Sequence, residues 1–252
     1  MTETTTTLAE ETREALVGAV KPRRFGAWYI AEHRFRVMRS YLQTLLLTAF
    51  GYPLLYLFAM GIGLGGLVSQ NLGDEGVGGV SYLVFVAPAL LCTAAVTVAS
   101  EEFTYPVMLG FKWNPTFYGM NAAPIAPGQI IDGIVISVAA RLLTASVIYY
   151  VIMLVFGASP SPLGFLAILV ATLGGLAFGT LIMAYVSTLE QDTGQLALVM
   201  RFVLLPMTLF SGTFFPLSAM PWFLQWIGWL SPCGTQPSCR ASSPTGPPSR
   251  SG

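Results

Sequence analysis

The stretch Phe210–Pro232, FSGTFFPLSAMPWFLQWIGWLSP, indicates what kind of fold the whole chain adopts. A long apolar run ends here at a Ser-Gly pair, two prolines interrupt the chain, and an aromatic segment follows. Its tryptophans recur at positions i, i+4 and i+7, so one helix face would carry Trp222, Trp226 and Trp229. Indole rings prefer the headgroup level of a membrane, where the ring is dehydrated and the N–H keeps a partner. The stretch therefore predicts a membrane span followed by a short helix anchored in one membrane surface.

The composition extends this interpretation to the rest of the chain. The 252 residues are 54% hydrophobic and only 10% charged, with a mean hydropathy of +0.67. A soluble domain carries about 25% charged residues, so this chain lacks the polar surface that a soluble fold needs. The polar N-terminus has no short apolar core of a cleavable signal peptide. We expect an all-α, polytopic bundle of membrane helices.

The region before the first apolar run divides into two parts. Residues 1–20 are rich in Thr and Glu and predict a polar cytoplasmic tail. Residues 21–41, KPRRFGAWYIAEHRFRVMRSY, mix six Lys or Arg residues with aromatic side chains. Trp28 and Tyr29 can share a helix face and anchor it, while the arginines reach headgroups. We therefore predict an amphipathic helix in the membrane interface; the alternative is a basic flank that only fixes the topology.

Five apolar runs are long enough to cross a bilayer: residues 42–66, 80–100, 130–156, 163–188 and 196–215. Residues 21–41, just before the first run, contain six positive residues, whereas the loops after the first and third runs contain none. The positive-inside rule then places the N-terminus in the cytoplasm and the protein in the cell membrane.

Arg141 lies unusually deep for a charged residue. It is about eleven residues, or roughly 16 Å, into the third run. A charge at such depth is costly unless it meets water, headgroups or a partner, and no acidic residue is expected at matching depth in the other runs. Arg141 is therefore a candidate for lining a wet translocation path. Snorkelling toward an interface, or a bond to a backbone oxygen, explains it equally well.

Motifs for catalysis or for cofactor, metal and nucleic-acid binding are missing from the sequence. The one histidine, His33, lies in the basic flank, and no Walker A loop is present. No acidic residue lies near the middle of a run, which argues against a secondary transporter driven by ions. We expect no enzyme site, no cofactor, no metal and no nucleic-acid partner.

The connection between the second and third runs, residues 101–129, combines charges, prolines and aromatic rings. Aromatic side chains in a short cytoplasmic loop are awkward in water and indicate docking onto a soluble partner. The alternative is that the rings lie flat on the membrane. The candidate docking residues are Glu101, Glu102, Tyr105, Lys112, Trp113, Phe117 and Tyr118.

Three pieces of the chain resemble the permease subunit of an ABC-2 type exporter of the nodulation (lipo-oligosaccharide) and drug-export kind. They are the basic aromatic flank, the loop EEFTYPVMLGFKWNPTFYGMNAAPIAPGQIIDG, and the stretch Phe210–Pro232. The resemblance implies an ABC-2 transmembrane domain over residues 42–230 with six spans. It also implies a second permease subunit, identical or paired, and a separate pair of ATPase subunits that hydrolyse ATP. The substrate would be an amphiphilic drug, a lipid or a lipid-linked glycan. The competing hypothesis is a non-transport membrane protein, such as a scaffold or an intramembrane enzyme.

Residues 231–252 depart from that family pattern. After Pro232 the chain reads CGTQPSCRASSPTGPPSRSG, with no apolar residue larger than Ala, Cys or Pro, where the resemblance implies a sixth span. Synonymous codons for residues 233–241, read with one added base, can encode Leu-Trp-His-Ala-Ala-Gln-Leu-Ser-Arg. We therefore interpret residues 231–252 as an out-of-frame tail; the alternative is a natural disordered tail.

Overall fold

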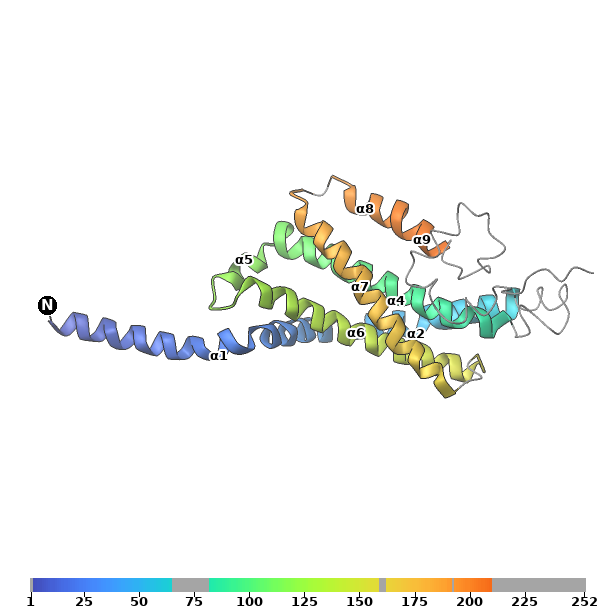
Figure 1. The fold of residues 1–252 in the computed structure, drawn as a ribbon, viewed down its shortest axis with the longest axis horizontal. Helices are drawn as coiled ribbons and strands as arrows, with labels where there is room; N and C mark the ends of the chain where they lie inside the picture. Colours follow the sequence, from blue (N-terminus) through green and yellow to red (C-terminus); the bar gives the residue numbers. More distant parts are fainter. Residues whose placement is uncertain (1, 65–81, 159–161, 192, 210–252) are drawn as a thin grey trace, which may run out of the picture.

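The computed structural model describes residues 2–64, 82–158, 162–191 and 193–209 (Figure 1). All regular structure within these ranges is helical, which confirms the all-α prediction. The anchors Trp222, Trp226 and Trp229 and the tail 231–252 lie outside the described residues.

The helices run in chain order as follows: α1 (Thr2–Ser40), α2 (Leu42–Phe58), a π-helical turn (Ala59–Leu64), α4 (Tyr82–Met108), a second π-helical turn (Leu109–Trp113), α5 (Thr116–Asn121), α6 (Pro127–Val155), a 3₁₀ turn (Pro162–Phe165), α7 (Leu166–Thr188), α8 (Gln195–Val199), a third π-helical turn (Met200–Leu204) and α9 (Leu205–Leu209). Within the described ranges, three helices are long and apolar enough to cross a membrane: α4 with its π-helical turn, α6 and α7. The pair α1 and α2, bent by 78°, makes a fourth if it counts as one span. The protein is thus a polytopic helical membrane bundle.

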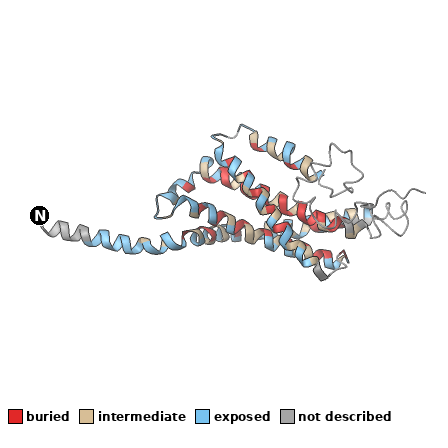
Figure 2. Ribbon diagram, in the orientation of Figure 1, coloured by how far each residue is buried: buried red, intermediate tan, exposed pale blue. Residues whose placement is uncertain are grey.

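The core of the bundle lies along α4. Its buried residues form a nearly continuous strip where α6 and α7 cross it (Figure 2). Gly175 and Gly179 on α7 allow this close approach, because an added Cβ would lie 3.0 Å from the Ala95 carbonyl oxygen and 2.4 Å from the Phe103 ring, respectively. Lipid tails are as apolar as leucine, so close packing of small residues is a main source of helix association in a membrane.

Helix α1 has two parts with different surroundings. Its N-terminal part extends away from the bundle (Figure 1), and its chain is kinked at Phe25, where φ is −117° and ψ is 19°. Its C-terminal part packs along α6. Residues 21–40 are therefore helical, and Trp28 and Tyr29 on them are exposed; the position of this segment in the membrane interface stays a prediction.

The second apolar helix does not end at Ser100, where the sequence placed its end. Helix α4 continues to Met108, and the π-helical turn carries it to Trp113. The Ser100 hydroxyl donates to the Val96 carbonyl, so the side chain is satisfied within the helix and does not terminate it. The prediction of a polar loop beginning at Glu101 is therefore wrong. Most of residues 101–129 are helical, and α6 begins at Pro127, three residues before the expected start.

Candidate functional site

One carboxylate on α4 joins three helices through two ion pairs. Nη2 of Arg34, on α1, donates to Oε2 of Glu102 over 3.0 Å. Nη1 of Arg141, on α6, donates to Oε1 of the same carboxylate. The Glu102 side chain is 9% exposed, and the side chains of Arg34 and Arg141 are 15% and 20% exposed. Buried charges of this kind are costly when isolated, so each member of this Glu102 triad depends on the others.

The triad corrects the expectation that no acidic residue lies at the depth of Arg141. Glu102 lies eleven residues before Trp113, and Arg141 lies fourteen residues after Pro127. These separations correspond to about 16 and 21 Å along the two helices, counted from the ends on either side of α5. The two charged residues therefore start from similar depths, and their side chains meet in the ion pair. The signal was present in the sequence, because no glycine or proline separates Ser100 from Tyr105 and a helix could run on through Glu102.

Helix α1 is also fastened to the start of α6 by a hydrogen bond from Gln129, whose side chain accepts a second, local bond. The Gln129 Nε2 nitrogen donates to the Arg23 carbonyl over 2.8 Å, and Gln129 Oε1 accepts from the Ala126 N–H over 3.0 Å. A Cβ added at Gly133 would lie 2.7 Å from the Ala27 carbonyl oxygen, so the two backbones nearly touch. This contact brings the basic end of α1 beside the membrane helix that carries Arg141.

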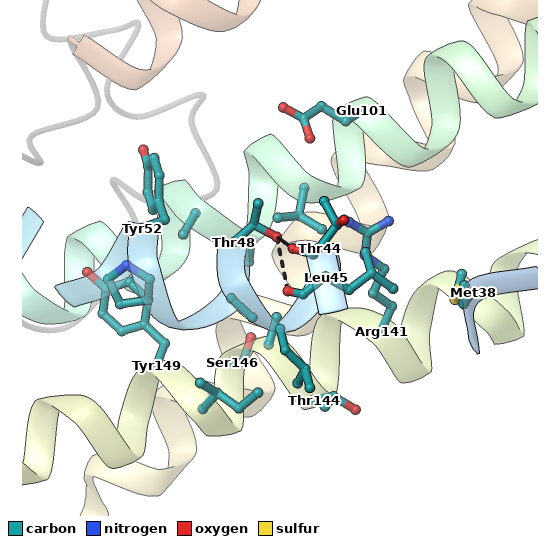
Figure 3. A pocket seen from close by; sticks show the side chains of 18 of the residues that line it. Met38, Thr44, Leu45, Thr48, Tyr52, Glu101, Arg141, Thr144, Ser146 and Tyr149 are labelled. Carbon is teal, nitrogen blue, oxygen red and sulfur yellow. Dashed lines mark hydrogen bonds between the residues drawn. The ribbon is translucent and has the colours of Figure 1, made fainter. Parts of the chain in front are cut away.

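A cavity of about 610 Å³ lies beside the triad, among α1, α2, α4 and α6. Figure 3 shows Glu101 of α4 and Arg141 of α6 toward one end, and Tyr52 of α2 and Tyr149 of α6 toward the other. Its middle is lined mainly by Leu, Ala, Val and Ile side chains and by threonine hydroxyls that bond to their own helices, as at Thr48. Its size is that of a small-molecule binding pocket.

The candidate docking residues do not share one environment. Tyr105, Trp113 and Tyr118 are 44%, 52% and 62% exposed, and Glu101 and Lys112 are exposed as well. Glu102 is buried in the triad and is thus not available for a surface contact.

Phe117 is also buried, because it folds back onto the second π-helical turn. Its ring meets Phe111 edge-on at 4.9 Å between centroids. It also fills the space beside Gly110, where an added Cβ would lie 2.3 Å from the ring. Phe117 therefore supports the shape of this corner and contributes to a second cavity of about 380 Å³ between α4, α6 and α7. In the part of the chain that the structure describes, no group of three or more His, Cys, Asp or Glu residues could hold a metal ion.

Known proteins are similar in sequence to most of the region that contains these helices. A family model described as ABC-2 type transporter matches residues 27–234. Nodulation protein J of Rhizobium leguminosarum bv. trifolii is 30% identical over 169 residues, which are 67% of this chain and 62% of that protein. Nodulation protein J of Rhizobium meliloti (strain 1021) is 28% identical over 180 residues, 71% of this chain and 66% of that protein.

A third relative comes from Escherichia coli (strain K12). Its Inner membrane transport permease YadH is 29% identical over 214 residues, 81% of this chain and 76% of that protein. The chain thus spans slightly less than two thirds of the two nodulation relatives and more of YadH. No solved structure matches the chain significantly.

Proposed function

The chain belongs to the ABC-2 type transporter family, and on that premise we propose that it is the permease subunit of an ATP-driven exporter. The sequence has no phosphate-binding loop, so ATP would be hydrolysed by a separate pair of ATPase subunits on the cytoplasmic face. A second permease subunit, identical or different, would complete the path. The substrate would be an amphiphile such as a drug, a lipid or a lipid-linked glycan.

The observation that carries the proposal is the position of Glu102 on α4. The exposed rings of Tyr105, Trp113 and Tyr118 follow it on α4, the second π-helical turn and α5. A partner that binds this surface and moves would displace α4 directly. Because Glu102 pairs with Arg34 and Arg141, any shift of α4 would move α1 and α6 with it or would break an ion pair. In this arrangement, movement of the bound partner would change how α1, α4 and α6 pack, from one state to another.

The proposed topology places the N-terminus, α1 and α5 on the cytoplasmic side. The basic residues of α1 would then face the anionic leaflet, as the positive-inside rule requires. Lys112 remains a candidate for a polar contact with the ATPase, since it is exposed on the π-helical turn that continues α4, whereas Glu101 lines the cavity together with Arg141. For Arg141 the ion pair with Glu102 supplies a structural role, and its place on the cavity wall keeps it a candidate for the translocation path.

Co-purification with the cognate ATPase tests this function. The double variant Trp113→Ala, Tyr118→Ala removes two exposed rings without touching the core, and we expect at least about tenfold weaker binding, as for a truncated interface hot spot. The control is Phe165→Ala, which removes an equally exposed ring (50% exposed) before α7, at the opposite end of the bundle.

Two results would contradict the proposal at different points. If the wild-type chain recovers no protein with a Walker A loop, the exporter assignment fails. If the ATPase binds the double variant as tightly as the wild type, the partner is right and the docking surface is wrong.

A further inference from the structure

The cavity among α1, α2, α4 and α6 has polar groups that nothing in the described chain satisfies. Tyr149 lines the cavity but is only 2% exposed, and its hydroxyl group, itself buried, has no hydrogen-bond partner among the described residues. Arg39, from the last turn of α1, also lines the cavity and takes part in no ion pair within the described ranges. A buried hydroxyl without a partner is destabilising relative to a paired one. The unpaired guanidinium of Arg39, exposed at one end of the cavity, favours an occupant that carries oxygen atoms.

The charges around the cavity favour an anion at one end. Arg34, Arg39 and Arg141 bring three guanidinium groups to this region, and Glu101 and Glu102 bring two carboxylates. One positive charge is left over. The carboxylate of Glu102 already occupies one nitrogen of Arg141, and a guanidinium has five N–H donors, so further donors remain for a ligand. Phosphate groups match this donor set.

The walls beyond the charged end suit an apolar chain. Leucine, alanine and valine side chains from α2 and α4 line the cavity between Arg141 and Tyr149, which lie about 12 Å apart along α6. The outer face of α2 is itself apolar and exposed, with Leu47 and Leu55 at 75% and 71% exposure. This face would lie against acyl chains in a bilayer, so lipid would surround the helix that forms one wall of the cavity.

We propose that this cavity binds a membrane phospholipid with an anionic headgroup. The phosphate lies against Arg39 and Arg141, the ester oxygens follow on the side of Tyr149, and an acyl chain runs between α2 and α6. The bound lipid fills the angle at the bend between α1 and α2 and holds the interfacial helix against the bundle. The lipid is proposed as a resident ligand and not as the exported substrate, so its binding to the purified permease does not rest on the proposed function.

Thermal unfolding of the full chain in a neutral detergent tests the proposal. Phosphatidylglycerol, added at about a hundredfold excess over its Kd, should raise Tm by roughly 5–10 °C. Phosphatidylcholine with the same acyl chains should raise Tm far less, and sodium phosphate alone should leave Tm unchanged because it lacks the chain. Native mass spectrometry should also find phosphatidylglycerol retained on the wild-type protein.

Substitutions show which residues the rise in Tm with phosphatidylglycerol depends on. Arg39→Gln should lose most of the Tm rise, and Tyr149→Phe should lose part of it. The matched control is Arg36→Gln: Arg36 is three residues from Arg39, is 78% exposed, pairs with Glu32, and does not line the cavity. We expect it to keep the full rise and the retained lipid.

Several results would overturn the proposal. An equal rise with phosphatidylcholine would show that the headgroup charge is irrelevant, and a full rise with phosphate alone would remove the acyl chain from the site. Equal losses in Arg36→Gln and Arg39→Gln would indicate general attraction to the basic surface of α1. A Tm that no added lipid changes would mean that the cavity is closed to lipid, for example by another segment of this chain.

Discussion

Helix α4 is held on two sides by opposite kinds of contact. Toward α7 it packs through glycines and apolar side chains, with Gly179 against Phe103. Toward α1 and α6 it is held by the Glu102 triad. The first contact depends on shape, acts at short range and allows one close-packed arrangement. The second depends on charge, and its members can exchange partners or meet water when the helices shift.

This difference suggests a division of labour within the bundle. A shape-based contact transmits force as one rigid body, so α4 and α7 should move together. An ionic joint can hold two arrangements of similar energy, provided that each one pairs the charges. The α4–α7 pair is then the rigid unit, and the Glu102 triad is the joint about which α1 and α6 turn.

The largest effect is expected when the joint loses its carboxylate. Glu102→Gln keeps the shape but leaves two arginines buried without a counter-charge, which should lower the free energy of unfolding by about 3–5 kcal/mol. Thermal unfolding of the purified protein and its abundance in the membrane measure this. Glu101→Gln is the control, because it removes a neighbouring but exposed carboxylate and should cost at most about 1 kcal/mol.

Replacing the whole triad sharpens this prediction. A triple variant with methionine at positions 34, 102 and 141 should regain stability, since matched apolar replacements of buried ion pairs are often neutral. Equal stability of Glu102→Gln and Glu101→Gln would show that the triad is not desolvated. The triad would then not be a distinct ionic contact, in contrast to the shape-based contact between α4 and α7.

A smaller effect is expected at the shape-based contact. Gly179→Ala puts a methyl group 2.4 Å from the Phe103 ring, so ring and helix must shift, at a cost of about 1–3 kcal/mol. Gly51→Ala on α2 is the control, because nothing lies within 4 Å of the added Cβ. Alanine favours the helix there, so its Tm should stay equal or rise slightly. If both variants unfold at the same temperature, the α4–α7 contact is looser than the described packing.

The smallest effect is expected at the hydrogen bond that fastens α1 to α6. Gln129→Ala removes this bond to the Arg23 carbonyl and also the local bond from the Ala126 N–H, which should lower the stability of the α1–α6 contact by about 1–2 kcal/mol. The loss should appear as faster hydrogen exchange around the Phe25 kink, while the Tm of the bundle changes little. Gln43→Ala at an exposed position of α2 should leave this exchange unchanged. Protection at the kink that survives in Gln129→Ala would show that α1 is held by other contacts.

The sequence by itself determined the fold class and the helical character of the interfacial segment. Runs of about twenty apolar residues and a low charge content can be satisfied only by membrane helices, because each backbone group must find a partner within its own segment. Pro127 also gave a usable signal, since proline is favoured in the first turn of a helix. These are local properties, and a linear chain carries them without reference to its partners.

Only the tertiary structure decided which residues meet. Glu102 looked like a surface acid because hydropathy falls after Ser100, yet backbone hydrogen bonding continues α4 past that point and buries the side chain between two arginines. Phe117 looked like a docking ring, yet the space beside Gly110 takes it in. For Glu102 the deciding quantity is the position of Arg34 and Arg141, 68 and 39 residues away in the chain, whereas for Phe117 it is the fold of the nearby turn at Gly110. Burial and the pairing of charges depend on how elements pack against one another, so they cannot be derived from the sequence of one element alone.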